Sequence, residues 1–117
     1  MIDNTIIIYH NPRCSKSREA LAYLKNKEVI FTIREYLKEP LTKEELAVLF
    51  AKLGSDIQHV LRKNEDVYKK KYKGKELAGK KVIDAIFADQ ILMERPIVEV
   101  NDKAIVARPT EKIDEIL

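Results

Sequence analysis

The 117-residue chain has one cysteine, no tryptophan, three glycines and four prolines. Cys14 alone cannot form an internal disulfide, and a single free thiol is typical of proteins in a reducing cytoplasm. No stretch approaches the ~20 apolar residues of a membrane-spanning helix, and the first residues lack the basic segment and cleavage site of a secretory signal. We therefore expect a cytoplasmic protein that does not contact a membrane.

The chain also lacks a strong excess of either charge. Its 22 basic and 19 acidic residues give a net charge of +3, which is too small to indicate binding to nucleic acid. The most basic stretch, residues 69–81, is interpreted as a solvated surface loop, and the alternative of a polyanion-binding patch is weaker because the stretch is short. Metal binding has little support, since Cys14, His10 and His59 show no ligand spacing.

The length and the pattern of apolar residues predict one α/β domain over residues 1–117. Residues 5–9 are β-branched and aromatic, which indicates a strand. A helix at 15–27 and a second strand within 29–36 follow, so that these three elements form a βαβ unit with a right-handed crossover.

The remaining elements predict a helical insertion and then a β-β-α ending. Thr42 and Glu45 form a capping box that starts a helix at Lys43, and Ser55 with Gln58 resembles a second box. Strands at 97–100 and 104–107 form a hairpin, and Thr110 caps a final helix. The expected order is β-α-β, helical insertion, β-β-α.

Cys14 lies on the predicted turn between the first strand and the first helix. Unpaired backbone N–H groups and the dipole at a helix start favour a thiolate, and Arg13, Lys16 and Arg18 add positive charge. Both effects lower a cysteine pKa from about 8.5, and the thiolate is the nucleophilic form. A buried apolar cysteine is the alternative, but the polar and basic neighbours favour a reactive one.

Three arginines lie at predicted ends of elements, where binding sites often assemble: Arg62, Arg95 and Arg108. The planar guanidinium suits oxyanions, although spacing alone is equally consistent with ordinary surface arginines. Pro96 belongs at the start of a strand or in a cis turn. His10 has either a proton-donating or a structural role.

Four separated motifs resemble the arsenate reductase family of the glutaredoxin-coupled, thioredoxin-fold type. They are IIIYHNPRCSKSREAL at residues 6–21, LRKNEDVY at 61–68, ERPIV at 94–98 and ARPTE at 107–111. The resemblance covers nearly the whole chain and implies a thioredoxin-like fold with a helical insertion, in agreement with the order of elements above.

The resemblance also implies the chemistry. Cys14 would attack the arsenic of arsenate, glutathione would act as co-substrate, and glutaredoxin would assist the release of arsenite, with no bound cofactor. Arg62, Arg95 and Arg108 would bind the anion. His10, Asn11 and Ser17 would shape the loop and stabilise the thiolate, and Pro96 would occupy the cis-proline position of the fold.

The residues after Cys14 depart from the family's reductases, which have Gly-Thr where this chain has Ser15-Lys16. This pattern resembles an arsenate reductase-like branch. One alternative is a glutathione-linked thiol reductase with a different acceptor. Another is a non-catalytic, partner-binding relative of the Spx-type regulators, although those carry a Cys-x-x-Cys, whereas positions 11 and 17 here are Asn and Ser.

Overall fold

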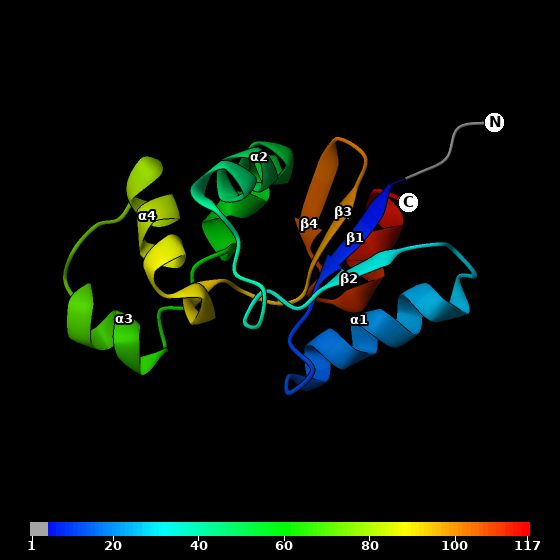
Figure 1. Cartoon of the computed structure of the whole chain (residues 1–117), viewed down its shortest axis with the longest axis horizontal. Helices are drawn as coiled ribbons and strands as arrows, with labels where there is room; N and C mark the ends of the chain where they lie inside the picture. The colour runs from blue at the N-terminus through cyan, green and yellow to red at the C-terminus, as the bar shows by residue number, and fades with distance from the viewer. Residues whose placement is uncertain (1–4) are drawn as a thin grey trace.

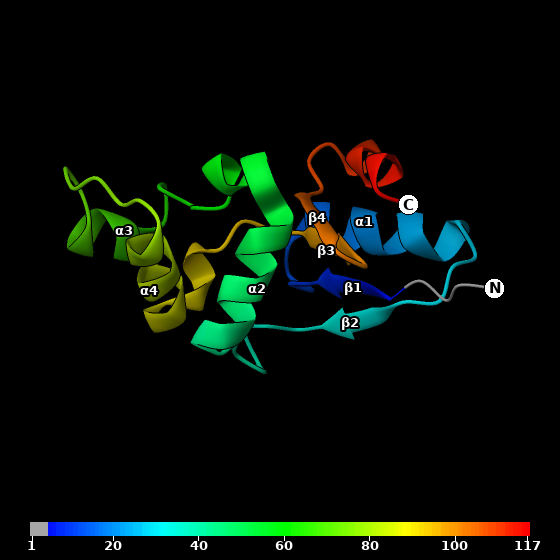
Figure 2. The same cartoon turned by 90° about the horizontal axis from the view of Figure 1, so that it is seen from above.

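The computed structural model describes residues 5–117, which form a four-stranded sheet with helices on both faces (Figures 1 and 2). The strands are β1 (Ile6–Tyr9), β2 (Thr32–Arg34), β3 (Ile97–Val100) and β4 (Lys103–Val106), in the spatial order β2-β1-β3-β4. Strand β2 is parallel to β1, while β3 is antiparallel to both β1 and β4. The α/β class and the C-terminal hairpin are confirmed.

Helix α1 (Ser15–Asn26) connects β1 to β2 and completes the predicted βαβ unit. Its buried residues, Ser17, Ala20 and Leu24, are spaced by three and four positions, as expected for one face of a helix. Strand β2 is shorter than predicted, because only residues 32–34 of the apolar segment pair with β1 at the sheet edge.

Two apolar cores lie on opposite faces of the sheet. The first packs the sheet against α1 and the 3-10 helix η3 (Thr110–Glu115), and Ile8, Leu24 and Ile113 are fully buried in it. The second and larger core lies beneath the helical insertion. Because side chains alternate along a strand, Ile97 belongs to the second core and its neighbour Val98 to the first.

The helical insertion separates β2 from β3. It consists of α2 (Lys43–Leu53), η1 (Gly54–His59), α3 (Asp66–Lys71), α4 (Lys80–Ala88) and η2 (Gln90–Leu92). Helix α2 packs on the sheet, whereas α3 and α4 extend beyond it (Figures 1 and 2), so the molecule measures 47 × 26 × 24 Å. The basic stretch 69–81 is only partly a loop, since its first and last residues lie in α3 and α4.

The predicted capping box begins α2. The Oγ1 of Thr42 accepts a hydrogen bond from the Glu45 N–H at 3.1 Å, and the Glu45 carboxylate accepts one from the Thr42 N–H at 3.0 Å. Two backbone donors that the first turn leaves unpaired are thereby satisfied.

The caps predicted at Ser55 and Thr110 are wrong. Both lie in 3-10 helices that have no side-chain capping bond. Asp56 has tertiary partners instead, because its carboxylate accepts the Val106 N–H at 3.0 Å and pairs with Lys112 at 3.3 Å. These contacts attach η1 to β4 and η3.

One carboxylate is buried in the larger core. Glu99 of β3 is 6% exposed, and it accepts hydrogen bonds from the hydroxyl of Tyr9 and from Nζ of Lys52 on α2, both at 2.8 Å. A buried charge is tolerated when it is paired and hydrogen-bonded, and here each carboxylate oxygen has a partner.

We predict that Thr42→Ala lowers the free energy of unfolding by about 1 kcal/mol, because the Glu45 N–H loses its acceptor. Thr110→Ala is the matched control, since Thr110 makes no capping bond, and it should change stability by less than about 0.5 kcal/mol. Urea unfolding followed by circular dichroism measures both, and equal losses in the two variants would contradict the assignment of the cap.

Candidate active site

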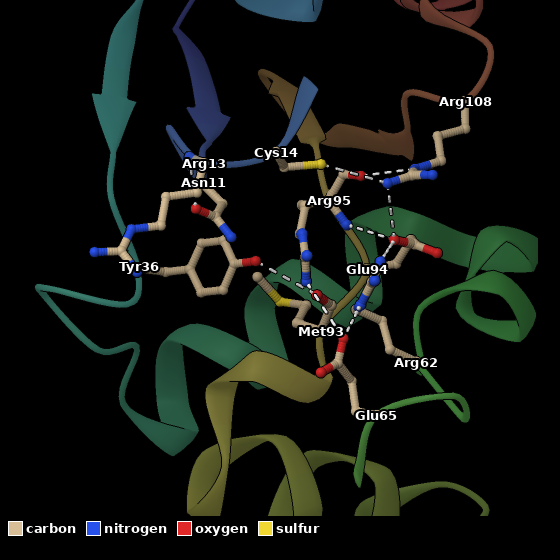
Figure 3. A network of polar contacts seen from close by, with 10 residues as sticks. All are labelled: Asn11, Arg13, Cys14, Tyr36, Arg62, Glu65, Met93, Glu94, Arg95 and Arg108. Atoms are coloured by element: carbon tan, nitrogen blue, oxygen red, sulfur yellow. Dashed lines mark hydrogen bonds and ion pairs between the residues drawn. The ribbon is translucent and has the colours of Figure 1, made fainter. Parts of the chain in front are cut away.

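The last residues of β1 and β4 and the first residue of β3 lie side by side, at the same end of the strands of the sheet. Tyr9, Ile97 and Val106 lie in one row across β1, β3 and β4. Because β3 is antiparallel to its neighbours, the residues after β1, before β3 and after β4 all lie beyond this row. Cys14, Glu94, Arg95 and Arg108 therefore come together beyond this row (Figure 3).

Arg62 comes from the helical insertion and lies at the same end of the strands. An isolated antiparallel bridge joins Leu61 to Met93, and the Arg62 N–H donates to the Leu92 carbonyl at 2.7 Å. This pairing places Arg62 beside Glu94, with which it forms an ion pair.

A buried hydrogen-bonded cluster shapes the Cys14 loop. The Oγ of Ser17 accepts the Asn11 N–H at 3.0 Å and lies 2.6 Å from Nδ1 of His10. These three side chains are among the few buried polar ones. The Cys14 N–H donates to the Asn11 carbonyl at 3.0 Å, which closes the turn that leads into α1.

The cluster favours a neutral His10. The pKa of His10 lies below its ordinary value, mainly because the side chain is buried. The charges of Arg18 and Lys25 lower this pKa further, and the charge of Glu35 opposes them. In the tautomer that carries its proton on Nε2, a neutral His10 can accept the hydroxyl proton of Ser17 at Nδ1. The side-chain contact of His10 in the structure is therefore with Ser17 of α1.

The Cys14 thiol is half-buried and favours the thiolate. Burial raises the pKa of Cys14, but the backbone N–H groups of Ser17 and Lys16 and the guanidinium of Arg95 together lower it below its ordinary value. Nη2 of Arg108 lies 3.6 Å from the sulfur. A larger fraction of Cys14 is thus ionised at neutral pH than of a free cysteine.

The cations that neighbour Cys14 in sequence point elsewhere. Arg18 donates to a loop carbonyl at 3.0 Å, and Lys16 forms an exposed ion pair along α1. Figure 3 shows that Arg13 extends away from the sulfur. The side-chain charge that contacts Cys14 comes instead from arginines distant in the sequence, which corrects our expectation.

Two carboxylates that we did not anticipate lie among the three arginines (Figure 3). Oε1 of Glu94 accepts from Nη1 of Arg62 and, at 3.0 Å, from the backbone N–H of Arg95. The same oxygen lies 3.4 Å from Nη2 of Arg108. Glu65 accepts from Nε of Arg62 at 3.0 Å and lies 3.9 Å from Nη1 of Arg95. The three arginines predicted to bind an anion therefore lie close together, and the two carboxylates neutralise part of their positive charge.

Two nitrogens of the Arg95 guanidinium make no hydrogen bond within residues 5–117, although one of them, Nη1, lies within ion-pair distance of Glu65. The Arg95 side chain runs between Tyr36 on one side and Arg62 with Glu94 on the other (Figure 3), and it is 14% exposed. Its Nε and Nη1 are shielded from solvent and make no hydrogen bond to any residue of 5–117. Buried polar atoms nearly always have a partner, and a guanidinium is well matched to an oxyanion.

A cavity of about 640 Å³ opens beside Arg62 and Arg108, and neither Arg95 nor Cys14 is among its lining residues. Its lining includes Arg62, Glu94 and Arg108 from the cluster, with His59, Lys63 and Lys112 around them. This volume lies in the range of small-molecule sites. Most of the charged side chains of the lining are basic, which suits an anionic ligand.

Pro96 follows Arg95 through a cis peptide bond and directly precedes β3, and the Arg108–Pro109 bond is cis as well. Over residues 5–117 we find no group of three or more His, Cys, Asp or Glu side chains that could hold a metal ion. In that same part of the chain, every helix is too short or too polar to cross a membrane.

A family model described as "ArsC family" matches residues 9–116. The chain belongs to the ArsC family. Among relatives of this ArsC chain, the arsenate reductase of Haemophilus influenzae is 41% identical over 115 residues, which cover 97% of this chain and 99% of the relative. An uncharacterized protein of Escherichia coli, YfgD, is 41% identical over 112 residues and 94% of each chain.

Solved structures of ArsC relatives agree with the fold. The arsenate reductase from Vibrio cholerae superimposes with a TM-score of 0.90 at 37% sequence identity, over 99% of this chain and 100% of that one. The family and the thioredoxin-like fold inferred from the sequence are therefore confirmed.

We predict that iodoacetamide alkylates Cys14 with a pH midpoint below about 8.5, since the thiolate is the reactive form and its pKa is lowered. Arg95→Met should move the midpoint to higher pH, whereas Arg13→Met, at a side chain that points away, should not. Intact mass spectrometry reports Cys14 alone because the chain has no other cysteine. A wild-type midpoint at or above that of a free thiol would refute the electrostatic argument.

Proposed function

We propose that this chain is an arsenate reductase in which Cys14 attacks an arsenate held by Arg62, Arg95 and Arg108. The observation that supports this most is the position of two guanidinium groups against one sulfur. Nη2 of Arg108 lies 3.6 Å from Sγ. Arg95 lowers the pKa of Cys14, a thiol whose burial alone would raise it, and the Nε and Nη1 atoms of Arg95 make no hydrogen bond within residues 5–117. The arsenate reductases among the relatives support the choice of substrate.

The first step forms a bond between sulfur and arsenic. The Cys14 thiolate attacks the arsenic of H₂AsO₄⁻, and one oxygen leaves as water with the two protons of the anion. The product is a thioester of As(V) that carries two negative charges. The guanidinium groups of Arg95 and Arg108 offset this charge, and such preorganised charges stabilise transition states strongly.

Reduction needs a second thiol from outside, because arsenic gains two electrons and the chain has one cysteine. An external thiol attacks the Cys14 sulfur, and the sulfur–arsenic bond breaks with its electron pair left on arsenic. A disulfide forms between Cys14 and the external thiol, arsenic becomes As(III), and the thiol proton passes to arsenite. A further thiol then frees Cys14 by disulfide exchange.

We assign these external thiols to glutathione and glutaredoxin, as the family resemblance implies. A reducing cytoplasm supplies such thiols, and the single free cysteine is consistent with that compartment. In this scheme residues 1–117 act as one domain and need no resident cofactor.

Wild-type protein should reduce arsenate in the presence of glutathione and glutaredoxin, and Cys14→Ser should fall to background, because a serine hydroxyl is not ionised at neutral pH. Oxidised glutathione, coupled to NADPH consumption by glutathione reductase, measures turnover. Reactions without arsenate provide the blank. Wild-type turnover that does not exceed this blank would refute the assignment of arsenate as substrate, and turnover retained by Cys14→Ser would refute the nucleophile.

Arg95→Lys should raise the KM for arsenate roughly tenfold or more, since a lysine cannot reproduce the planar pair of donors and a hydrogen bond to a charged group contributes about 1.5–3 kcal/mol. Arg13→Lys makes the same chemical change on the far side of the loop and should leave KM unchanged. Steady-state kinetics at saturating glutathione measures both. An unchanged KM in Arg95→Lys would exclude Arg95 from anion binding.

A further inference from the structure

Glu94 has an unusual position, because one of its carboxylate oxygens contacts the guanidinium groups of Arg62 and Arg108 and the backbone N–H of Arg95. Oε1 accepts from Nη1 of Arg62 and, at 3.0 Å, from the backbone N–H of Arg95. It also lies 3.4 Å from Nη2 of Arg108. A bound oxyanion would therefore have to share these donors with a negative charge that belongs to the protein.

The charges around this oxygen nearly cancel. The three arginines face Glu94 and Glu65, so the cluster has a net charge of +1, and the Cys14 thiolate reduces it to zero. His59, Lys63 and Lys112 line the adjoining cavity, and Lys112 is itself paired with Asp56. Within the cluster of the three arginines, Glu94, Glu65 and the thiolate, little net positive charge is therefore left to hold a multiply charged anion.

We infer that Glu94 determines specificity, by making the site favour singly charged over doubly charged tetrahedral oxyanions. The Coulomb energy between two groups is proportional to the product of their charges, so Glu94 repels a dianion with twice the energy with which it repels a monoanion. The inference rests on the proposed anion site, but it does not depend on which oxyanion is the substrate.

This selectivity suits the proposed chemistry. The singly charged H₂AsO₄⁻ already has the two protons that its departing oxygen takes away as water. The doubly charged form has one proton, so the same step would release hydroxide or require a proton from another group. A site that discriminates against the dianion therefore selects the form that can react without an additional acid.

The test uses sulfate and methanesulfonate, tetrahedral oxyanions with charges of −2 and −1, on the full-length protein. A bound anion protects Cys14 from iodoacetamide, and its concentration dependence at constant ionic strength gives a dissociation constant. In Glu94→Gln we expect methanesulfonate to bind at least roughly fivefold tighter, which is the effect of removing one unit charge at about 4 Å in the dielectric of bulk water. Sulfate should bind at least roughly 25-fold tighter, the square of that factor.

Two control variants separate charge from geometry. Glu28→Gln makes the same charge change beyond the opposite end of α1, and it should leave both constants unchanged. Glu94→Asp keeps the charge on a shorter side chain, so the preference for methanesulfonate should persist although both anions bind with altered affinity.

An equal change for both anions in Glu94→Gln, or weaker binding of both, would overturn the inference and leave Glu94 with the role of holding the arginines. Absence of protection by either anion in the wild type would overturn it as well. Arsenate turnover of the same preparations is measured separately, so a failure of the charge selectivity can be distinguished from a failure of the proposed function.

Discussion

The antiparallel pairing of β3 with both β1 and β4 is the constraint on which the site depends. It aligns Tyr9, Ile97 and Val106 in one row, so that a residue before β3 and residues after its two neighbours meet beyond it. Cys14 and Arg108 are 94 positions apart in sequence, yet their side chains are in contact. If β3 were parallel to its neighbours, Arg95 would lie at the opposite end of the strands, far from Cys14.

The electrostatics of the site follow from this arrangement. The guanidinium of Arg108 is tethered by a 2.8 Å hydrogen bond from its Nε to the Arg95 carbonyl, and Glu94 and Glu65 hold Arg62. Arginines tethered in this way do not have to reorganise when negative charge develops, and that is the condition under which fixed charges are most effective. The buried His10–Ser17 pair fixes the loop from the other side.

The sequence allowed most of the elements to be predicted, because their signals are local. The Thr42 capping box and the C-terminal hairpin need only neighbouring residues to form. The helix caps expected at Ser55 and Thr110 did not form, and near the first of them tertiary contacts of Asp56 attach the segment to β4 and η3 instead. Local rules fail where a distant partner offers a better hydrogen bond.

The site was only partly predictable for the same reason. Cys14 could be selected from its residue type and its position on a turn, whereas the three arginines were equally consistent with surface residues until the family resemblance assigned them to the site. Glu94 and Glu65 could not be selected, since both are ordinary carboxylates until the bridge between Leu61 and Met93 brings their segments together. The cations beside Cys14 in sequence were misleading, because proximity along the chain does not fix the direction of a long side chain.

The buried Glu99 has a consequence for the geometry of the candidate site. Its carboxylate joins β3 to Tyr9 of β1 and to Lys52 of α2, and all three groups lie on the same face of the sheet. A slip of β3 by one residue would turn Glu99 to the other face, away from both partners, and would leave a charge buried among apolar side chains. The same slip would shift Arg95 by about 3.3 Å relative to Cys14. Glu99 thus disfavours the shifted register of β3, in which the Cys14 sulfur and the Arg95 guanidinium would be too far apart to interact.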